Sequence, residues 1–201
     1  EGARKNTMVV ADGKVFATVG TSVVVIEAGK DEIANTIEFE DRVSGVIKAS
    51  DGNILVSDGS GNITKVDVKT YTKLGSSKVS DEAKSVLSAS FAAAPSITAK
   101  GDTLYMSGLS SKIYRHVFGS DKTELMVDAK DMVDNVGIIY NTCAVHPITG
   151  EVYLNSIKGY SDYKTNNITV FDFSGDEPKV SVNYENYTAF PAGTFFTYNF
   201  E

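Results

Sequence analysis

Apolar and polar residues alternate in short runs along most of the chain, and turn signals separate the runs. Four turn pairs are the clearest of these signals, at Asp12-Gly13, Asp51-Gly52, Gly101-Asp102 and Thr149-Gly150. After them come the runs KVFATVG, NILVSDG, TLYMSGL and EVYLNSI, and past a further turn each is followed by a second run. Such alternation is typical of β-strands with one face more buried than the other. The pattern therefore predicts an all-β protein.

The turn pairs recur at similar spacing. Their glycines stand at positions 13, 52, 101 and 150, which are 39, 49 and 49 residues apart. A short apolar run precedes each pair and a third run closes most units, so each unit has four expected strands. Four antiparallel strands repeated every ~40–50 residues are typical of β-propeller blades. A β-sandwich also uses many short strands, but the in-register recurrence of turn, strand and turn favours the propeller.

The repeat predicts one partial propeller domain over residues 1–201, with approximate blades at 6–40, 41–80, 94–131 and 141–184. The segment 190–200, in FPAGTFFTYNFE, corresponds to the first strand of a fifth unit and is expected to act as a closing strand. Since the N-terminal unit already has its own first strand, TMVVA, we expect three companion strands before Glu1. The chain would then be the C-terminal part of a larger propeller. A closed four-bladed ring is the alternative.

Composition narrows the possible partners. The chain has 201 residues, 42% of them hydrophobic, which suffices for one sizeable core. Its net charge is −7 and its 19 basic residues are scattered, which argues against nucleic acid as a partner. Its one cysteine, Cys143, excludes an internal disulfide and is expected in the core. No apolar run is long enough for a membrane span.

Two units carry a resemblance to a known family: SDGNILVSDGSGNITKVDVKT and HPITGEVYLNSIKGYSDYKTNNITVFDFSGD. Their order of turn pair, apolar strand, Gly- or Asn-rich turn and second strand resembles the YncE-like β-propellers. The likeness is greatest to uncharacterised secreted or lipid-anchored propellers of Gram-negative gut bacteria, whose Phe-Pro element near the C-terminus is similar to YTAFPAGTFF here.

This resemblance implies a seven-bladed ring and a location that is secreted, periplasmic or on the outer-membrane surface. It also implies a mostly non-enzymatic role, because related surface propellers capture ligands, cobalamin among them, and hand them to outer-membrane transporters. The partner would be a corrinoid-like small molecule, a glycan or a transporter protein. No ligand contact of those relatives matches a motif in this chain.

One turn is expected to be long. In a propeller, the turns between second and third strands share a face with the blade connections, and that face is the usual binding face. Three of these turns are short, whereas the fourth, SIKGYSDYKTNN, predicts a long loop. Its tyrosines suit stacking on a flat ligand or a sugar ring, or else they anchor their own loop. The candidate ligand-binding residues are Tyr160, Asp162, Tyr163, Lys164 and Asn166, with Tyr140 from a blade connection.

Signals for chemistry are few. The chain has two histidines, His116 in an expected strand and His146 in a turn, and no GxSxG motif. No catalytic residue, metal site or cofactor is predicted. Two alternatives to a non-enzymatic binding protein stay open: a propeller hydrolase or lyase using Tyr105 and Arg115 in the central channel, and a structural scaffold in a surface protein complex.

Overall fold

Four four-stranded antiparallel sheets make up most of the computed structural model, which describes residues 7–88, 96–108 and 110–196. The first sheet contains β1 (Met8–Ala11), β2 (Lys14–Val19), β3 (Ser22–Glu27) and β4 (Ile33–Glu38). The second contains β5 (Val43–Lys48), β6 (Ile54–Asp58), β7 (Asn62–Val66) and β8 (Lys73–Lys78). The third contains β9 (Ser96–Lys100), β10 (Thr103–Ser107), β11 (Lys112–Val117) and β12 (Thr123–Asp128). The fourth contains β13 (Ile138–Val145), β14 (Val152–Gly159), β15 (Asp162–Asp172) and β16 (Lys179–Glu185).

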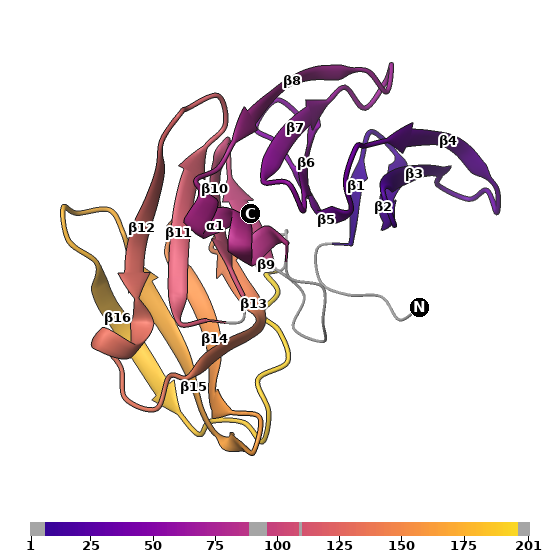
Figure 1. The fold of residues 1–201 in the computed structure, drawn as a ribbon. Coiled ribbons are helices and arrows are strands. Elements are labelled where there is room, and N and C mark those ends of the chain that lie inside the picture. The colour runs from indigo at the N-terminus through magenta and orange to yellow at the C-terminus, as the bar shows by residue number, and fades with distance from the viewer. Residues whose placement is uncertain (1–6, 89–95, 109, 197–201) are drawn as a thin grey trace.

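The sheets stand side by side in an arc (Figure 1). Within each sheet the strands are neighbours in sequence order, and the first strands of successive sheets contact one another, β1 with β5, β5 with β9 and β9 with β13. This is the arrangement of propeller blades around an axis, so the prediction of an all-β propeller with four-stranded blades is confirmed. The first and fourth sheets lie at opposite ends of the arc, so the described residues do not form a closed ring of four.

Three apolar clusters fill the spaces between neighbouring sheets. Phe16 of the first sheet and Ile54 of the second belong to one cluster, and both are fully buried. Leu55, the next residue along β6, belongs to the second cluster with Leu104 of the third sheet. The third cluster joins the third and fourth sheets around Ile113 and Phe171. Because consecutive residues of a strand point to opposite faces, the second sheet buries both of its faces.

The connection between the second and third sheets contains a helix. Helix α1 (Asp81–Leu87) begins after Ser80, whose hydroxyl accepts a hydrogen bond from the Ala83 amide at 3.4 Å. Val86 and Leu87 are buried in the cluster between these two sheets. A short 3-10 helix, η1 (Ala129–Asp131), lies in the next connection.

The turns between second and third strands lie beside the blade connections, as expected. The Val43 amide donates to the Gly20 carbonyl at 2.9 Å, and the Gly59 amide donates to the Arg42 carbonyl at 2.9 Å. The Ile139 amide donates to the Ser110 carbonyl, also at 2.9 Å. We call this side of the arc, with its turns and blade connections, the connection face.

Lysines join the blades on the opposite side, where the turn pairs lie. Lys65 of the second sheet contacts Asp51 of its own turn pair at 3.3 Å and Asp102 of the next at 3.1 Å. Burial alone would lower the pKa of Lys65, but its hydrogen bonds to Asp102 and Asp51 hold that pKa above its usual value. Lys100 of the third sheet reaches the Ile148 carbonyl of the fourth at 2.7 Å. These contacts join the second turn pair to the third, and the third sheet to the turn of the fourth.

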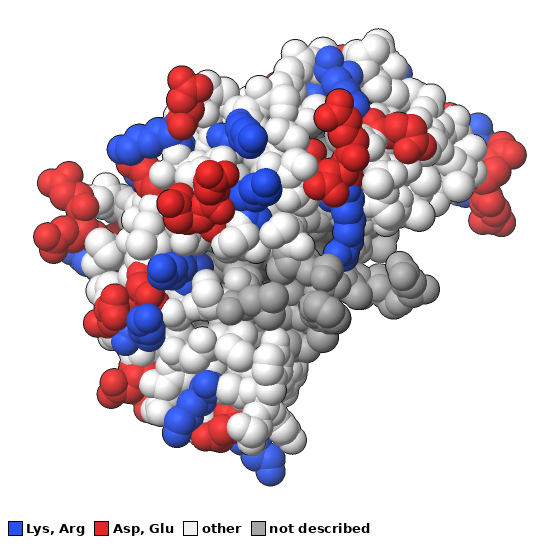
Figure 2. All heavy atoms as spheres, viewed as in Figure 1, with Lys and Arg blue, Asp and Glu red and all other residues white. Residues whose placement is uncertain are grey.

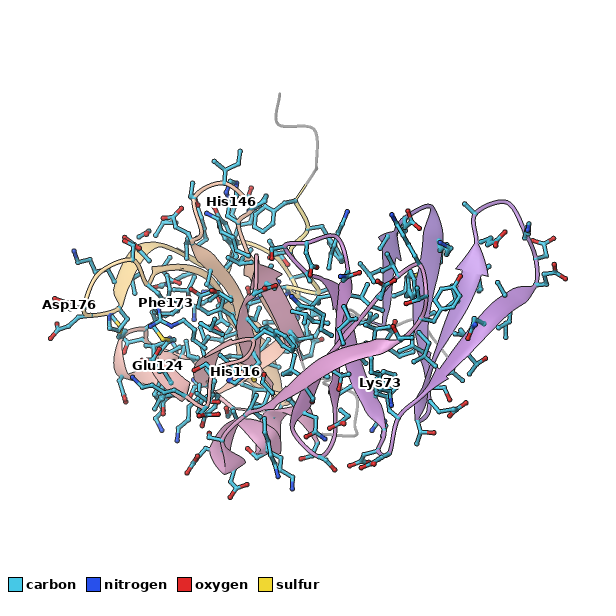
Figure 3. The ribbon with its side chains drawn as sticks, turned by 90° about the horizontal axis from the view of Figure 1, so that it is seen from above. Lys73, His116, Glu124, His146, Phe173 and Asp176 are labelled. Atoms are coloured by element: carbon cyan, nitrogen blue, oxygen red, sulfur yellow. The ribbon has the colours of Figure 1, made fainter. Side chains whose placement is uncertain are left out.

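His116 joins the second and third sheets from within (Figure 3). It is fully buried, and its Nε2 lies 2.8 Å from the Ser77 hydroxyl while its Nδ1 lies 3.1 Å from the Thr123 hydroxyl. Burial lowers the pKa of His116 because the charged imidazolium would lose its hydration. The expectation of an ordinary strand residue missed this hydrogen-bonded contact between blades.

The buried imidazole should make the protein sensitive to acid. Unfolded histidine takes up a proton near pH 6.5, whereas folded His116 stays neutral at that pH, so stability falls as the pH decreases below 6.5. We expect His116→Gln to remove this slope, which can reach about 1.4 kcal/mol per pH unit. Urea unfolding of both proteins between pH 7.5 and 5 measures it. His146 and all carboxylates are common to both proteins, so parallel stability curves would contradict the prediction.

Candidate functional site

The segment expected to be a long loop is instead an extended hairpin. Strands β14 and β15 continue until Gly159 pairs with Asp162, which leaves Tyr160 and Ser161 as a two-residue turn. Pairing lets the backbone groups of this segment hydrogen-bond to each other, which an irregular loop of the same length would not do. The expectation of a long loop is therefore wrong. We call residues 158–166 the hairpin tip.

A bulge shapes the hairpin tip. Ile157 pairs with Asn166 and Gly159 pairs with Asp162, so a single residue of β14 lies opposite three residues of β15. The Asn166 side-chain amide closes this bulge by donating to the carbonyls of Tyr163 at 3.3 Å and Lys164 at 2.9 Å. It also donates to the Thr188 carbonyl at 2.9 Å, in the segment after β16. Asn166 is only 1% exposed, so it supports the tip from its buried side.

Asp162 also holds the tip together. Its carboxylate accepts a hydrogen bond from the Thr165 hydroxyl at 2.9 Å, and Lys158 Nζ lies 3.5 Å from its other oxygen. The Thr165 hydroxyl and Lys158 lower the pKa of Asp162. The carboxylate is therefore ionised at neutral pH and engaged within the tip.

Two aromatic rings remain at the surface of the tip. The side chain of Tyr160 is 57% exposed and that of Tyr163 is 42% exposed. The Tyr163 ring packs edge-on against Phe190, with 5.8 Å between ring centroids and 74° between planes. Lys164 is exposed beside them. We call Tyr160, Tyr163, Lys164 and Phe190 the tip surface.

The structure places the six predicted site residues in two settings. Five of them belong to the hairpin tip, Tyr160, Tyr163 and Lys164 at its surface and Asp162 and Asn166 as its supports. The sixth, Tyr140, belongs to strand β13, and its side chain lies outside the described residues. Sequence reasoning missed Phe190 as a member of the surface, although its FPAG motif was visible.

The connection between β12 and β13 braces the base of the hairpin. The Gly137 amide donates to the Ile157 carbonyl at 3.1 Å, and the Asn167 side chain donates to the Asp134 carbonyl at 3.1 Å. A row of side chains continues the second contact, because Asn183 donates to Asn167 at 3.0 Å. Met132 of this connection is 42% exposed, whereas Ile139, at the start of β13, is fully buried. The tip thus projects from the connection face on a fixed base.

Tyr105 and Arg115 lie between the third and fourth sheets, away from the strands that line the axis. Tyr105 is stacked on Phe173 with ring centroids 5.8 Å apart, and burial raises its pKa. Arg115 donates to Glu124 from Nε at 3.0 Å and from Nη2 at 2.7 Å. Lys122 and Arg115 lower the pKa of Glu124 to about 2. Figure 3 shows Glu124 and Phe173 on this side of the molecule.

The described residues hold no group of three or more His, Cys, Asp or Glu side chains close enough to bind a metal ion.

A polar hollow of about 350 Å³ lies near the turn pairs of the first two sheets, lined by Asp12, Asp51 and Asp67 with Lys48 and Lys69. Acidic and basic side chains are interspersed over the face drawn in Figure 2. None of the helices in the described part of the chain is long and apolar enough to cross a membrane.

This geometry defines the class of the protein as a β-propeller that carries an aromatic hairpin tip on its connection face. The sequence matches the profile of a family described as Domain of unknown function (DUF5074) over residues 1–197, so the chain belongs to that family. No curated protein matches the chain.

A solved structure shares the fold. A chain of the "Crystal Structure of Mitotic Checkpoint Complex" is similar with a TM-score of 0.54 and 14% sequence identity. The similarity covers 92% of this chain and 58% of that one, so this chain spans little more than half of the solved chain's length. At such low identity the likeness shows the propeller fold alone.

Replacing Gly137 should disturb the hairpin base. A Cβ atom there would clash with the Lys158 carbonyl oxygen, whereas a Cβ atom at Gly159 would meet nothing within 4 Å. We expect Gly137→Ala to reduce the free energy of unfolding by about 1–3 kcal/mol, because backbone must move. Gly159→Ala, the matched control, should change it by less than about 1 kcal/mol. Chemical denaturation measures both, and equal values would contradict the close contact.

Proposed function

We propose that this protein is a secreted or cell-surface propeller that binds a ligand without chemically changing it, and that the tip surface makes the contact. The observation that carries the proposal is a pair of exposed tyrosine rings, Tyr160 and Tyr163, on a paired and braced hairpin. In the fold as a whole, a rigid scaffold that presents turns on one face suits binding and protein interaction.

The tip is suited to a ring-shaped ligand. Tyrosine offers a flat apolar face and a hydroxyl, and it loses little conformational entropy on binding because it has few rotatable bonds. Phe190 supports the ring of Tyr163 from the side, so part of its orientation exists before the ligand arrives. Lys164 adds a cation that can donate hydrogen bonds. This combination favours the sugar rings of a glycan.

A role in nutrient capture at the outer membrane rests on the resemblance of the repeat units to YncE-like surface propellers. In that role the protein would hand a glycan or a corrinoid-like molecule to a transporter. A second candidate is a scaffold for a protein partner, which further exposed aromatic residues favour. Tyr184 and Tyr187 are 47% and 75% exposed, with ring centroids 5.8 Å apart, and tyrosine is enriched at protein interfaces.

Titration calorimetry against neutral oligosaccharides, cobalamin and haem tests the proposal. We expect an oligosaccharide to bind, and the Tyr160→Ala/Tyr163→Ala double variant to bind it at least about tenfold more weakly, which corresponds to 1.4 kcal/mol. Leu125→Ala is the control, because Leu125 is 51% exposed but lies on the outer strand of the third sheet.

The outcomes separate the candidates. Tyr160→Phe/Tyr163→Phe should keep most of the affinity if stacking dominates. If cobalamin binds and the double alanine variant loses that affinity, the proposed site is supported, but the ligand is cobalamin and not a glycan. If the wild-type protein binds nothing in the panel, the ligand proposal is overturned and the scaffold is favoured.

A further inference from the structure

The outer face of the first sheet is apolar across all four strands. Val10, Val15, Ile26 and Ile33 stand opposite one another in register, one from each strand. A second row on the same face contains Met8, Ala17, Val24 and Thr36. We call these two rows the end face. The first sheet lies at one end of the arc in Figure 1, and the other side of this sheet packs against the second sheet.

The end face is open to solvent in the described structure. Met8 is 54% exposed, Val10 63% and Ile33 60%, and Val15 and Ile26 are half-buried. A contiguous apolar face of this kind is unusual on a protein surface and marks a place where something packs.

The repeat shows what packs at the same place in the other blades. Val15 and Ala17 are the second and fourth residues after their turn pair. The residues at these two positions in the other sheets are Ile54 and Val56, Leu104 and Met106, and Val152 and Leu154. All six are at most 1% exposed, and each pair faces the preceding sheet. The end face is therefore the equivalent of three faces that are buried against a preceding blade.

We infer that a further four-stranded blade, carried by the same polypeptide, packs on the end face. This goes beyond the binding role of the hairpin tip, since it concerns the other end of the arc. The side that each preceding sheet offers has an apolar or aromatic residue third after its turn pair: Phe16, Leu55 and Tyr105. The added blade should present such a residue toward Val15 and Ala17.

A second copy of the chain fits the end face less well. The only equivalent side left in the described arc belongs to the fourth sheet, where Tyr153 is third after its turn pair. The segment after β16 already covers that side, because the Phe196 ring packs edge-on against Tyr153 with centroids 5.1 Å apart. The Thr194 hydroxyl also donates to Asn155 Oδ1 at 3.3 Å. The solved propeller chain, in addition, extends well beyond the part that this chain matches.

Thiol labelling of the full-length protein, as its gene encodes it, tests the inference. Val10→Cys places a thiol on the end face, and Leu74→Cys, at a position 54% exposed on β8, is the control. The native Cys143 is fully buried, so the wild-type protein gives the background rate. We expect the thiol at position 10 to react at least about tenfold more slowly than that at position 74, equally at low and high protein concentration. Ile33→Cys is a second variant on the same row.

Each outcome of the labelling experiment either supports or overturns the inference. Protection that does not depend on concentration supports a blade of the same polypeptide. Protection that disappears on dilution would show that a second copy covers the face and would overturn the inference. Equal reaction rates at positions 10 and 74 at every concentration would show an uncovered face and overturn it as well.

Discussion

The burial of both faces of a sheet is the constraint on which the structure depends. Ile54 and Leu55 are consecutive residues of β6, they point to opposite sides, and they are 0% and 1% exposed. A sheet with this pattern is stable only between two neighbours, so the blades must stand side by side. Their first strands then meet near the axis, and the turns between second and third strands gather beside the blade connections. The connection face is thus a consequence of how the interior is filled.

The hairpin tip extends beyond the packed part of the fourth sheet. Its strands stay paired to the turn, Asn166 closes the bulge, and the Gly137 amide holds the base through Ile157. Ordering a flexible loop costs conformational entropy, whereas the strands of the tip are already paired in the folded protein. Exposed tyrosines on such a support have less conformational freedom to lose than the same tyrosines on a mobile loop.

The repeat was predictable from sequence because its signals are local. Asp-Gly turns and alternating runs such as KVFATVG depend on residues within one hairpin, and the four-stranded blades followed from their spacing. The form of the tip was not predictable in this way. Asn166 also ties the tip to the Thr188 carbonyl, 22 residues further on, and His116 meets Ser77 across 39 residues. Such contacts exist only after the blades pack, so composition suggested a loop where the strands continue.

The segment that covers the fourth sheet has a consequence for solubility. Structures built from stacked repeats expose a sticky surface at each end, and copies can then join head to tail into open filaments. Here the Phe196 ring packs edge-on against Tyr153 at one end, so part of that side is already covered within the chain. Stacking of a second copy on this side would therefore require the segment after β16 to move away from Tyr153.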